Sequence, residues 1–145
     1  MSYEDKSTLK NLKGCSIFTN FNDLRDFSKM RCGCIPFSGV GIFHKGDTAI
    51  LRSVDGIDFY DDNLYNSQNP KYTLFGKSGN QSVNESKFNK RLLNFTKNIY
   101  LYRQPSKGCW IWYGKYKIVG KEIKPHIGED KKMRNIIVLS LERVK

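Results

Sequence analysis

The stretch from Asp58 to Arg91, DFYDDNLYNSQNPKYTLFGKSGNQSVNESKFNKR, decides the fold of this chain. Two acids stand beside an aromatic ring at Tyr60–Asp62, an aromatic run closed by glycines follows at Tyr72–Gly79, and a basic segment ends the stretch at Lys87–Arg91. Carboxylates repel a phosphate backbone, but they fit a pocket for a base, because rings stack on its faces and a carboxylate accepts hydrogen bonds from its amino edge. The alternative is two strands and a polar surface turn, with the rings in the core.

Inside this stretch and after it, the pattern predicts short strands and one helix. Tyr72–Phe75 predicts a strand and Gly76–Asn80 a tight loop. Asn84 can cap a helix that buries apolar side chains at a helical spacing, namely Phe88, Leu92 and Phe95. Further strands are predicted at Ile99–Arg103, Cys109–Val119 and Asn135–Leu141, with a hairpin turn at Ser106–Gly108.

Before this stretch, the pattern predicts a helix and then a strand. Asn22 can cap a short helix that ends before Gly33 and buries one side, formed by Leu24, Phe27 and Met30. Thr48–Val54 predicts a strand. No repeat or linker divides the chain, so we expect one domain over residues 1–145, with residues 1–13 loose. The expected fold class is α+β, a twisted, mixed β-barrel or half-barrel with small flanking helices.

The charge of the chain is uneven. The 145 residues carry 25 Lys and Arg against 14 Asp and Glu, a net charge of +11. Residues 1–63 hold 8 basic and 9 acidic side chains, whereas residues 64–145 hold 17 and 5. Such an excess favours a polyanionic partner, nucleic acid before a membrane surface, and the alternative is a solvated lysine-rich surface. No apolar run could span a bilayer and no signal region opens the chain, so we expect an intracellular protein, cytoplasmic or at the nucleoid or nucleus.

The spacing of the cysteines does not match a known metal-binding or catalytic motif. Cys32 and Cys34 form a C-x-C pair rather than the C-x-x-C of zinc sites, and no second close pair accompanies Cys15 or Cys109. We therefore expect four free, partly buried thiols and no metal or other cofactor. A zinc site, or a catalytic pair of a cysteine with a histidine (His44 or His126), is the alternative.

No enzyme is predicted in this chain. A restriction-type nuclease needs an acid and then a D/E-x-K string on adjacent strands, in order to hold a metal ion. The string nearest to that pattern is Glu122-Ile123-Lys124, which lacks a partner strand with a suitable acid. A tryptophan pair, Trp110 and Trp112, shares one strand face, and we expect at least one of the two to pack in the core.

Four segments in order resemble SRA (YDG) domains, PUA-like modules that read modified cytosine in DNA. They are Tyr60–Asp62 with Tyr72–Gly79 (Tyr-Asp-Asp and Tyr-x-x-Phe-Gly-x-x-Gly), then Phe88–Leu93, then the strand pair Ile99–Arg103 and Trp110–Val119 with its Tyr-x-Gly-x-Tyr, and last the Arg-x-x-x-Val-x-x-Leu strand in Gly128–Leu141. The resemblance runs from about Gly39 to Val144. It is strongest to the compact forms found beside nuclease domains in modification-dependent restriction enzymes.

The resemblance implies a pocket in which the extruded base lies between two rings. Tyr60 matches the first ring. Asp62 matches the carboxylate that accepts from the cytosine amino group, and Asp61, one position away, would face the opposite side of an extended chain. The family's second ring is a tyrosine where this chain has Leu74, so Phe75 or Tyr72 would have to supply it.

The loop before the predicted helix is shorter than in larger SRA domains, which insert it into the duplex. Any side chain that fills the vacated space must therefore be small, such as Asn80 or Gln81. Phosphate contacts are expected from the basic residues that flank the pocket: Lys77, Lys87, Lys90 and Arg91. Such contacts set the register and the salt sensitivity of binding without reading sequence.

The resemblance implies a non-catalytic reader of methylated or hydroxymethylated cytosine in double-stranded DNA, acting by base flipping. A nuclease domain or subunit is a further candidate partner, and no membrane partner is expected. The alternatives are a PUA-like binder of modified RNA or of an altered DNA backbone, and a basic protein-interaction domain without a base pocket.

Overall fold

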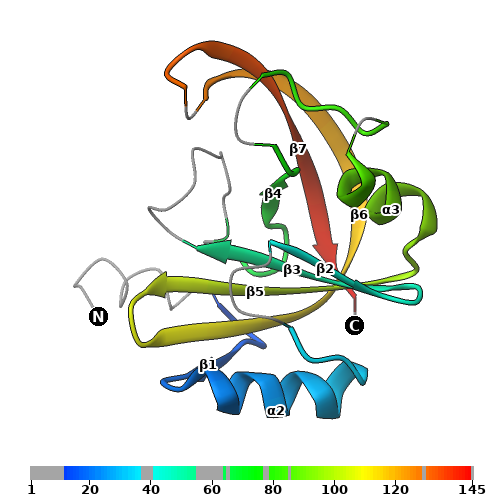
Figure 1. Cartoon of the computed structure of the whole chain (residues 1–145). Helices are drawn as coiled ribbons and strands as arrows, with labels where there is room; N and C mark the ends of the chain where they lie inside the picture. Colours follow the sequence, from blue (N-terminus) through cyan, green and yellow to red (C-terminus); the bar gives the residue numbers. More distant parts are fainter. Residues whose placement is uncertain are drawn as a thin grey trace.

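Seven strands form one twisted sheet in the structure of this chain, a computed structural model that describes residues 12–36, 41–54, 64, 66–76, 79–84, 86–128 and 130–144. The strands are β1 (Ser16–Phe18), β2 (Ile42–Lys45), β3 (Thr48–Val54), β4 (Lys71–Thr73), β5 (Asn98–Ser106), β6 (Cys109–Ile127) and β7 (Met133–Arg143). Their order is β2-β3-β5-β6-β7-β4, and β1 pairs with β6. Because β3 and β5 run parallel and the other pairs antiparallel, the sheet is mixed (Figure 1).

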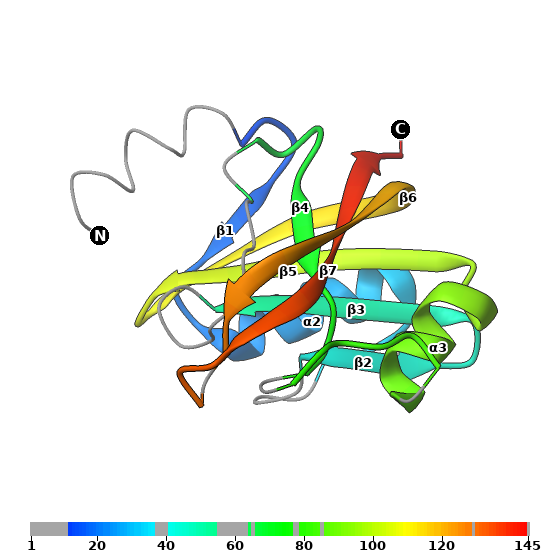
Figure 2. The same ribbon diagram turned by 90° about the horizontal axis from the view of Figure 1, so that it is seen from above.

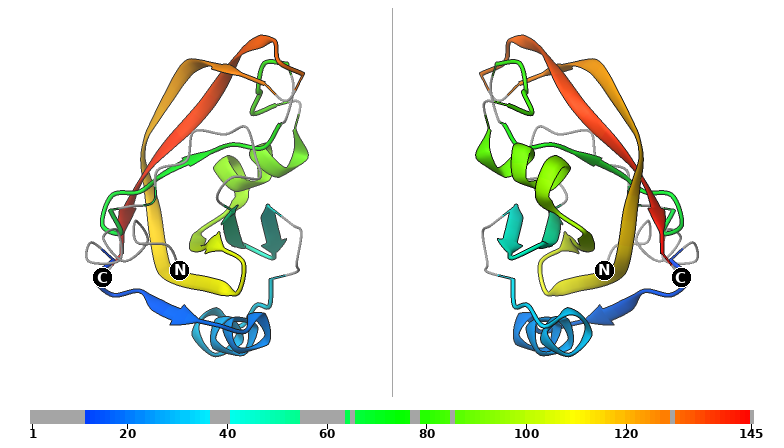
Figure 3. Two further views of the ribbon diagram at one scale, coloured as in Figure 1. Left: turned by 90° about the vertical axis from the view of Figure 1, so that its left-hand side faces the viewer. Right: turned by 90° about the vertical axis from the view of Figure 1, so that its right-hand side faces the viewer.

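The longer strands lie where the sequence pattern predicts them. β3 covers the predicted Thr48–Val54, and the turn at Lys107 and Gly108 confirms the hairpin between β5 and β6. β6 and β7 extend beyond the prediction, because they pair with each other as far as Ile127 and Met133. The result is a long, curved hairpin that arches away from the rest of the sheet (Figures 1 and 3).

The sheet stays open between β4 and β2, which end the strand order of the described residues. β4 has three residues and pairs with β7, so no backbone ladder reaches β2 or β3. A side chain spans the opening instead: the Tyr72 hydroxyl lies 3.1 Å from the carbonyl oxygen of Gly41 and 3.0 Å from that of Arg52. The α+β class, with a twisted, mixed sheet and small helices, is confirmed, and because the sheet is not closed it is a barrel only in a loose sense.

Helix α2 (Phe21–Cys32) covers one face of the sheet (Figure 2). Its N-cap is Asn20 rather than the predicted Asn22, since the Asn20 side chain accepts a hydrogen bond from the Asn22 N–H at 2.7 Å. Leu24 is buried as predicted, but Met30 is 71% exposed. The buried side of the helix runs through Leu24 and Ser28, four residues apart, and Met30 lies off that side.

Helix α3 (Lys87–Phe95) begins two residues later than predicted. Its N-cap is Ser86, whose hydroxyl accepts a hydrogen bond from the Asn89 N–H at 3.3 Å. Leu92 is buried as predicted, but Phe95 is 63% exposed. The buried face of α3 carries Asn89 beside Leu92, and Phe95 is the last helical residue, where the chain turns toward β5.

Apolar side chains form two clusters on opposite faces of the sheet. Ala49 and Leu51 of β3 belong to the larger cluster, and Ile50 belongs to the cluster against α2. Trp112 is buried and Trp110 is half-buried, both in the α2 cluster. The expectation that at least one tryptophan packs in the core is therefore confirmed.

The described end of the segment that was expected to be loose is anchored. Leu12 is buried in the larger cluster, and the Lys13 carbonyl accepts a hydrogen bond from the Ser67 hydroxyl at 3.0 Å. Residues 1–11 lie outside the described residues. Of the helices in the described ranges, none has the length and apolar character needed to cross a membrane.

Candidate nucleic-acid interface

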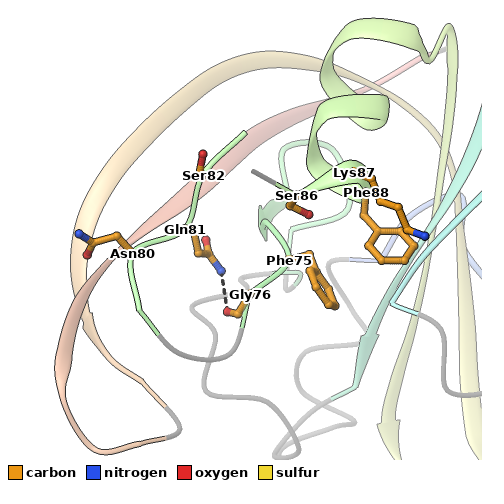
Figure 4. A pocket seen from close by; sticks show the side chains of 8 residues that line it. All are labelled: Phe75, Gly76, Asn80, Gln81, Ser82, Ser86, Lys87 and Phe88. Carbon is orange, nitrogen blue, oxygen red and sulfur yellow. Dashed lines mark hydrogen bonds between the residues drawn. The ribbon is translucent and has the colours of Figure 1, made fainter. Parts of the chain in front are cut away.

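A pocket of about 330 Å³ opens between the loop after β4 and the start of α3. Its lining combines two aromatic rings, polar side chains and a lysine: Phe75, Gly76, Asn80, Gln81, Ser82, Ser86, Lys87 and Phe88 (Figure 4). Phe75 is 43% exposed, and its ring centroid lies 5.1 Å from that of Phe88 at an interplanar angle of 54°. Lys87 Nζ lies 5.4 Å from the Phe88 ring centroid. The pocket thus joins an aromatic platform to a cation.

A buried amide of α3 holds the Phe75 backbone in place. Asn89 is 0% exposed, and its Oδ1 accepts a hydrogen bond from the Phe75 N–H at 2.8 Å. Its Nδ2 donates to the carbonyl oxygens of Phe75 at 2.9 Å and Ser82 at 3.1 Å. One side chain therefore satisfies both backbone groups of Phe75, as a neighbouring strand would. The Phe75 backbone is therefore held before any ligand arrives, which lowers the entropic cost of binding.

Two further side chains tie the same loop to β7. Gln81 Nε2 donates to the carbonyl oxygens of Leu74 at 2.6 Å and Gly76 at 3.0 Å, while its Oε1 accepts from the Ile137 N–H at 2.8 Å. Arg134 is buried and donates to the Gly76 carbonyl oxygen at 2.6 Å. Gly76 has a φ of 136°, a conformation that L side chains rarely adopt. A glycine here lets one carbonyl meet two donors.

The side chains that were predicted to fill the space left by a flipped base are already engaged. The three hydrogen bonds of Gln81 use both ends of its amide. Asn80 is exposed, but its Oδ1 accepts a hydrogen bond from the Asn135 N–H at 2.8 Å. Either side chain would have to give up bonds within the domain before it could enter a duplex.

The structure separates the two candidates for the second stacking ring. Phe75 lines the pocket with its ring half-exposed. Tyr72 is 4% exposed and belongs to the larger core cluster, because its register opposite Leu139 turns it inward. Its ring faces are covered, so the structure favours Phe75. Tyr60, Asp61 and Asp62 lie outside the described residues.

The predicted phosphate-binding residues of α3 present their charges to solvent. Lys87, Lys90 and Arg91 are exposed, and no carboxylate of the described residues forms an ion pair with them. Arg91 also donates to the Gly46 carbonyl oxygen at 3.1 Å, which ties α3 to the turn between β2 and β3. Lys77 lies outside the described residues. Among the described residues, the start of α3 therefore carries positive charge next to the pocket without a paired carboxylate.

Sequence reasoning missed three residues of this site. Asn89 and Arg134 hold the loop, and Phe88, which was assigned to the core, is half-buried and lines the pocket. The sequence contained a signal for Asn89 and for Arg134. Asparagine is a poor helix former inside a helix, and Arg134 alternates with the apolar Ile136 and Val138 along a buried strand.

Burial shifts the pKa of several titratable side chains in the described ranges. Burial, opposed by the charge of Arg143, raises the pKa of the Cys15 thiol, so that thiol stays protonated at neutral pH. Burial and then the charge of Arg91 lower the pKa of His44. Among these residues, no group of three or more His, Cys, Asp and Glu could hold a metal ion, and no disulfide joins the cysteines.

The fold is that of SRA-domain proteins of known structure. The sulfur-binding and SRA domains of ScoMcrA, complexed with phosphorothioated DNA, match with a TM-score of 0.53 and 21% identity over 66% of this chain and 30% of that chain. MspJI restriction endonuclease in complex with a 27-mer oligonucleotide matches with a TM-score of 0.61 and 15% identity, over 77% of this chain and 34% of that chain. KRYPTONITE in complex with mCHG DNA and SAH matches with a TM-score of 0.58 and 13% identity, over 100% of this chain and 39% of that chain. At these identities the likeness shows the fold alone, and this chain spans 30% to 39% of their lengths.

The sequence itself identifies the family within that class. Residues 24–145 match the family described as the ScoMcrA-like SRA domain, a span that runs from α2 through the pocket loop and α3 to the last residue. The chain therefore belongs to the ScoMcrA-like SRA domain family, and the resemblance drawn from its four segments is confirmed. No curated protein matches the sequence.

Proposed function

We propose that this chain is a non-catalytic reader of methylated or hydroxymethylated cytosine in double-stranded DNA, and that the modified base leaves the stack to enter the pocket at Phe75. The observation that carries the proposal is a half-exposed ring beside Lys87, its backbone locked by the buried Asn89. Unstacked bases bind to such rings because every base has a π-face. Family membership supports the proposal, since structures of SRA proteins contain phosphorothioated DNA in one case and mCHG DNA in another.

The proposed pocket needs a second ring and a hydrogen-bond acceptor, which the family resemblance assigns to Tyr60 and Asp62. Phe75 and Tyr60 would stack on the two faces of the base. The Asp62 carboxylate, or that of Asp61 beside it, would accept from the amino edge of cytosine and repel the carbonyl edge of thymine. Phe88 would support Phe75 from the side, at the 5.1 Å between their ring centroids.

The exposed cations of α3 supply the sequence-independent part of binding. Lys87, Lys90 and Arg91, with Lys77 before the helix, would contact phosphates around the flipped nucleotide. Each neutralised phosphate releases counterions, so the affinity for any duplex should fall steeply as salt rises. An affinity that stays flat from low to physiological salt would favour a protein-interaction domain instead.

A second candidate ligand is DNA with an altered backbone. The observation that favours it is the ScoMcrA structure, in which the bound DNA is phosphorothioated. A sulfur-substituted phosphate would be met by the cations of α3 rather than by the aromatic platform. The two candidates therefore differ in whether Phe75 or the lysines decide selectivity.

One titration separates these ligands. We would measure binding of fluorescent duplexes of one sequence that carry 5-methylcytosine, 5-hydroxymethylcytosine, a phosphorothioate or no modification, with the matching RNA as a fifth ligand. The expected order places the modified-cytosine duplexes first. Asp62→Ala should erase this preference and keep most of the salt-sensitive binding. A preference for the phosphorothioate or for RNA that Asp62→Ala leaves intact would contradict the proposal.

We expect that this chain does not cleave DNA. If it acts in restriction, a separate nuclease domain or subunit would cut the DNA. Glu122 lies exposed on β6 opposite Val138, and Asp130 is exposed beyond the end of that strand. We expect modified duplex to stay intact when the chain is incubated with Mg²⁺ or Mn²⁺. Cleavage that disappears in Glu122→Ala or Asp130→Ala would reveal a nuclease centre and overturn this part of the proposal.

A further inference from the structure

The far half of the β6–β7 hairpin, residues 121–127 and 133–137, projects from the sheet as an arm. The pairing of β6 with β5 ends at Tyr116, and the pairing of β7 with β4 begins at Val138. Between these points the two strands pair with each other and form the arch seen at the top of Figure 1. We call these residues the distal hairpin.

One face of the distal hairpin carries three exposed apolar side chains. Ile123, Ile127 and Met133 are 67%, 55% and 65% exposed, and Ile127 pairs directly with Met133, so the three side chains share a face. Pro125, between the two isoleucines, is also exposed. The opposite face carries Arg134 and Ile136, which are buried. Apolar side chains gathered on the outer face of a projecting ribbon indicate a surface that meets a ligand.

The distal hairpin is joined to the pocket through its backbone. Asn135 donates its N–H to Asn80 Oδ1 at 2.8 Å, and its carbonyl oxygen accepts from the Gln81 N–H at 2.9 Å. Asn80 and Gln81 both line the pocket. The loop that carries Phe75 and the hairpin therefore lie side by side.

The chemistry of the distal hairpin fits DNA better than a second copy of this chain. Lys121 lies on the same face as Ile123, and Lys131 and Lys132 lie at the turn; these three exposed lysines outnumber the exposed described acids of the hairpin, Glu122 and Asp130. Pro125 has no N–H to offer to an incoming strand, and a lysine-flanked edge resists strand pairing. A two-stranded ribbon fits the major groove, and isoleucine, methionine and proline are side chains that proteins place against or between base pairs.

We propose that the distal hairpin is a second DNA-contacting element, with Ile123, Ile127 and Met133 against the bases in a groove and the three lysines on the flanking phosphates. This inference rests on the proposed function, because the duplex held at the pocket is what brings DNA to the hairpin.

The chain contains a matched pair of methionines for the test. Met133 is 65% exposed on the hairpin, and Met30 is 71% exposed on α2, at the other side of the sheet. We would oxidise the full chain with dilute peroxide, with and without saturating modified duplex, and measure methionine sulfoxide in each peptide by mass spectrometry. DNA should slow oxidation of Met133 at least fivefold and leave Met30 unchanged. Equal rates at both methionines, in a complex shown to be saturated, would overturn the hairpin proposal and leave the pocket proposal standing.

Two further measurements separate the other outcomes. If Met133 becomes protected as protein concentration rises without DNA, a second copy of the chain covers the hairpin and the proposal is wrong. Ile127→Ser with Met133→Ser should weaken duplex binding about tenfold, whereas the control Ile17→Ser, on exposed β1, should not. An unchanged affinity in the double variant would overturn the proposal for the hairpin and leave the proposal for the pocket standing. A wild-type chain that binds no duplex overturns the proposed function and the hairpin together.

Discussion

The two helices that flank the sheet differ in where their charged residues lie along the helix. α2 has Asp23 in its first turn and Lys29 and Arg31 in its last, the arrangement that the helix dipole favours. α3 has no acid in its first turn and no base in its last, and it begins with Lys87 and Lys90 instead. Cations at the positive end of a helix cost stability. The charge order that the dipole favours is present in α2 and absent from the described residues of α3, so electrostatics within the helix does not explain Lys87 and Lys90.

The helices also differ in what they bury. α2 packs Leu24 into an aromatic cluster, and its buried Ser28 makes a hydrogen bond of 2.7 Å to the Cys34 carbonyl oxygen. α3 buries Asn89, whose amide makes three hydrogen bonds to the pocket loop. Apolar contacts tolerate small shifts of a helix, but a set of three hydrogen bonds does not. The comparison shows that α2 stabilises the sheet, while α3 also positions a ring.

The largest expected effect comes from removing the polar clamp. Asn89→Ala leaves one N–H and two carbonyl groups of the loop without a partner and should lower the free energy of unfolding by about 3 kcal/mol. Ser28→Ala, the matched change in α2, removes the bond to the Cys34 carbonyl oxygen and a long contact with Cys32 Sγ, and it should cost about 1 kcal/mol. Urea unfolding checks both values. Equal losses in the two variants would remove the distinction between the helices.

The second expected effect concerns two exposed rings: Phe75, in the loop after β4 beside the pocket, and Phe95, the last residue of α3. Phe75→Ala should weaken binding of modified duplex by about 1–3 kcal/mol, the range for an aromatic contact to an unstacked base. Phe95 is more exposed but does not line the pocket, so Phe95→Ala should leave affinity unchanged. Fluorescence anisotropy with one duplex measures both variants. If both lose affinity equally, the platform is not at Phe75.

The smallest expected effect has opposite signs for stability and binding. Lys90→Glu places an acid near the start of α3 and should raise the free energy of unfolding by about 0.3–1 kcal/mol. The same change should weaken all duplexes alike and flatten the salt dependence of binding, because one phosphate contact is lost. Lys29→Glu in the last turn of α2 is the control, expected to destabilise by about 0.3–1 kcal/mol without changing binding. A Lys90→Glu chain that is less stable and binds normally would contradict the functional reading of the α3 charges.

The sequence by itself determined those strands and turns whose formation depends on residues close together in the chain. The alternation in Thr48–Val54, the turn at Lys107 and Gly108, and the order of motifs behind the SRA resemblance were all present in the sequence. The basic segment next to an aromatic run was present as well, and so was Phe75 as one of two candidate rings. These features rest on periodicity and turn chemistry, which act over a few residues.

Only the tertiary structure decided which ring faces the pocket and what holds it there. β4 ends at Thr73, so strand alternation does not reach Phe75, and the pairing of Tyr72 with Leu139 turns the tyrosine into the core. The partners of the clamp lie far apart in sequence: Asn89 bonds to Phe75 across 14 positions, and Arg134 bonds to Gly76 across 58. Alternation marks Arg134 as a polar residue in a buried strand, but it does not identify the partner, because the sheet selects that partner when it brings β7 and α3 together around the loop.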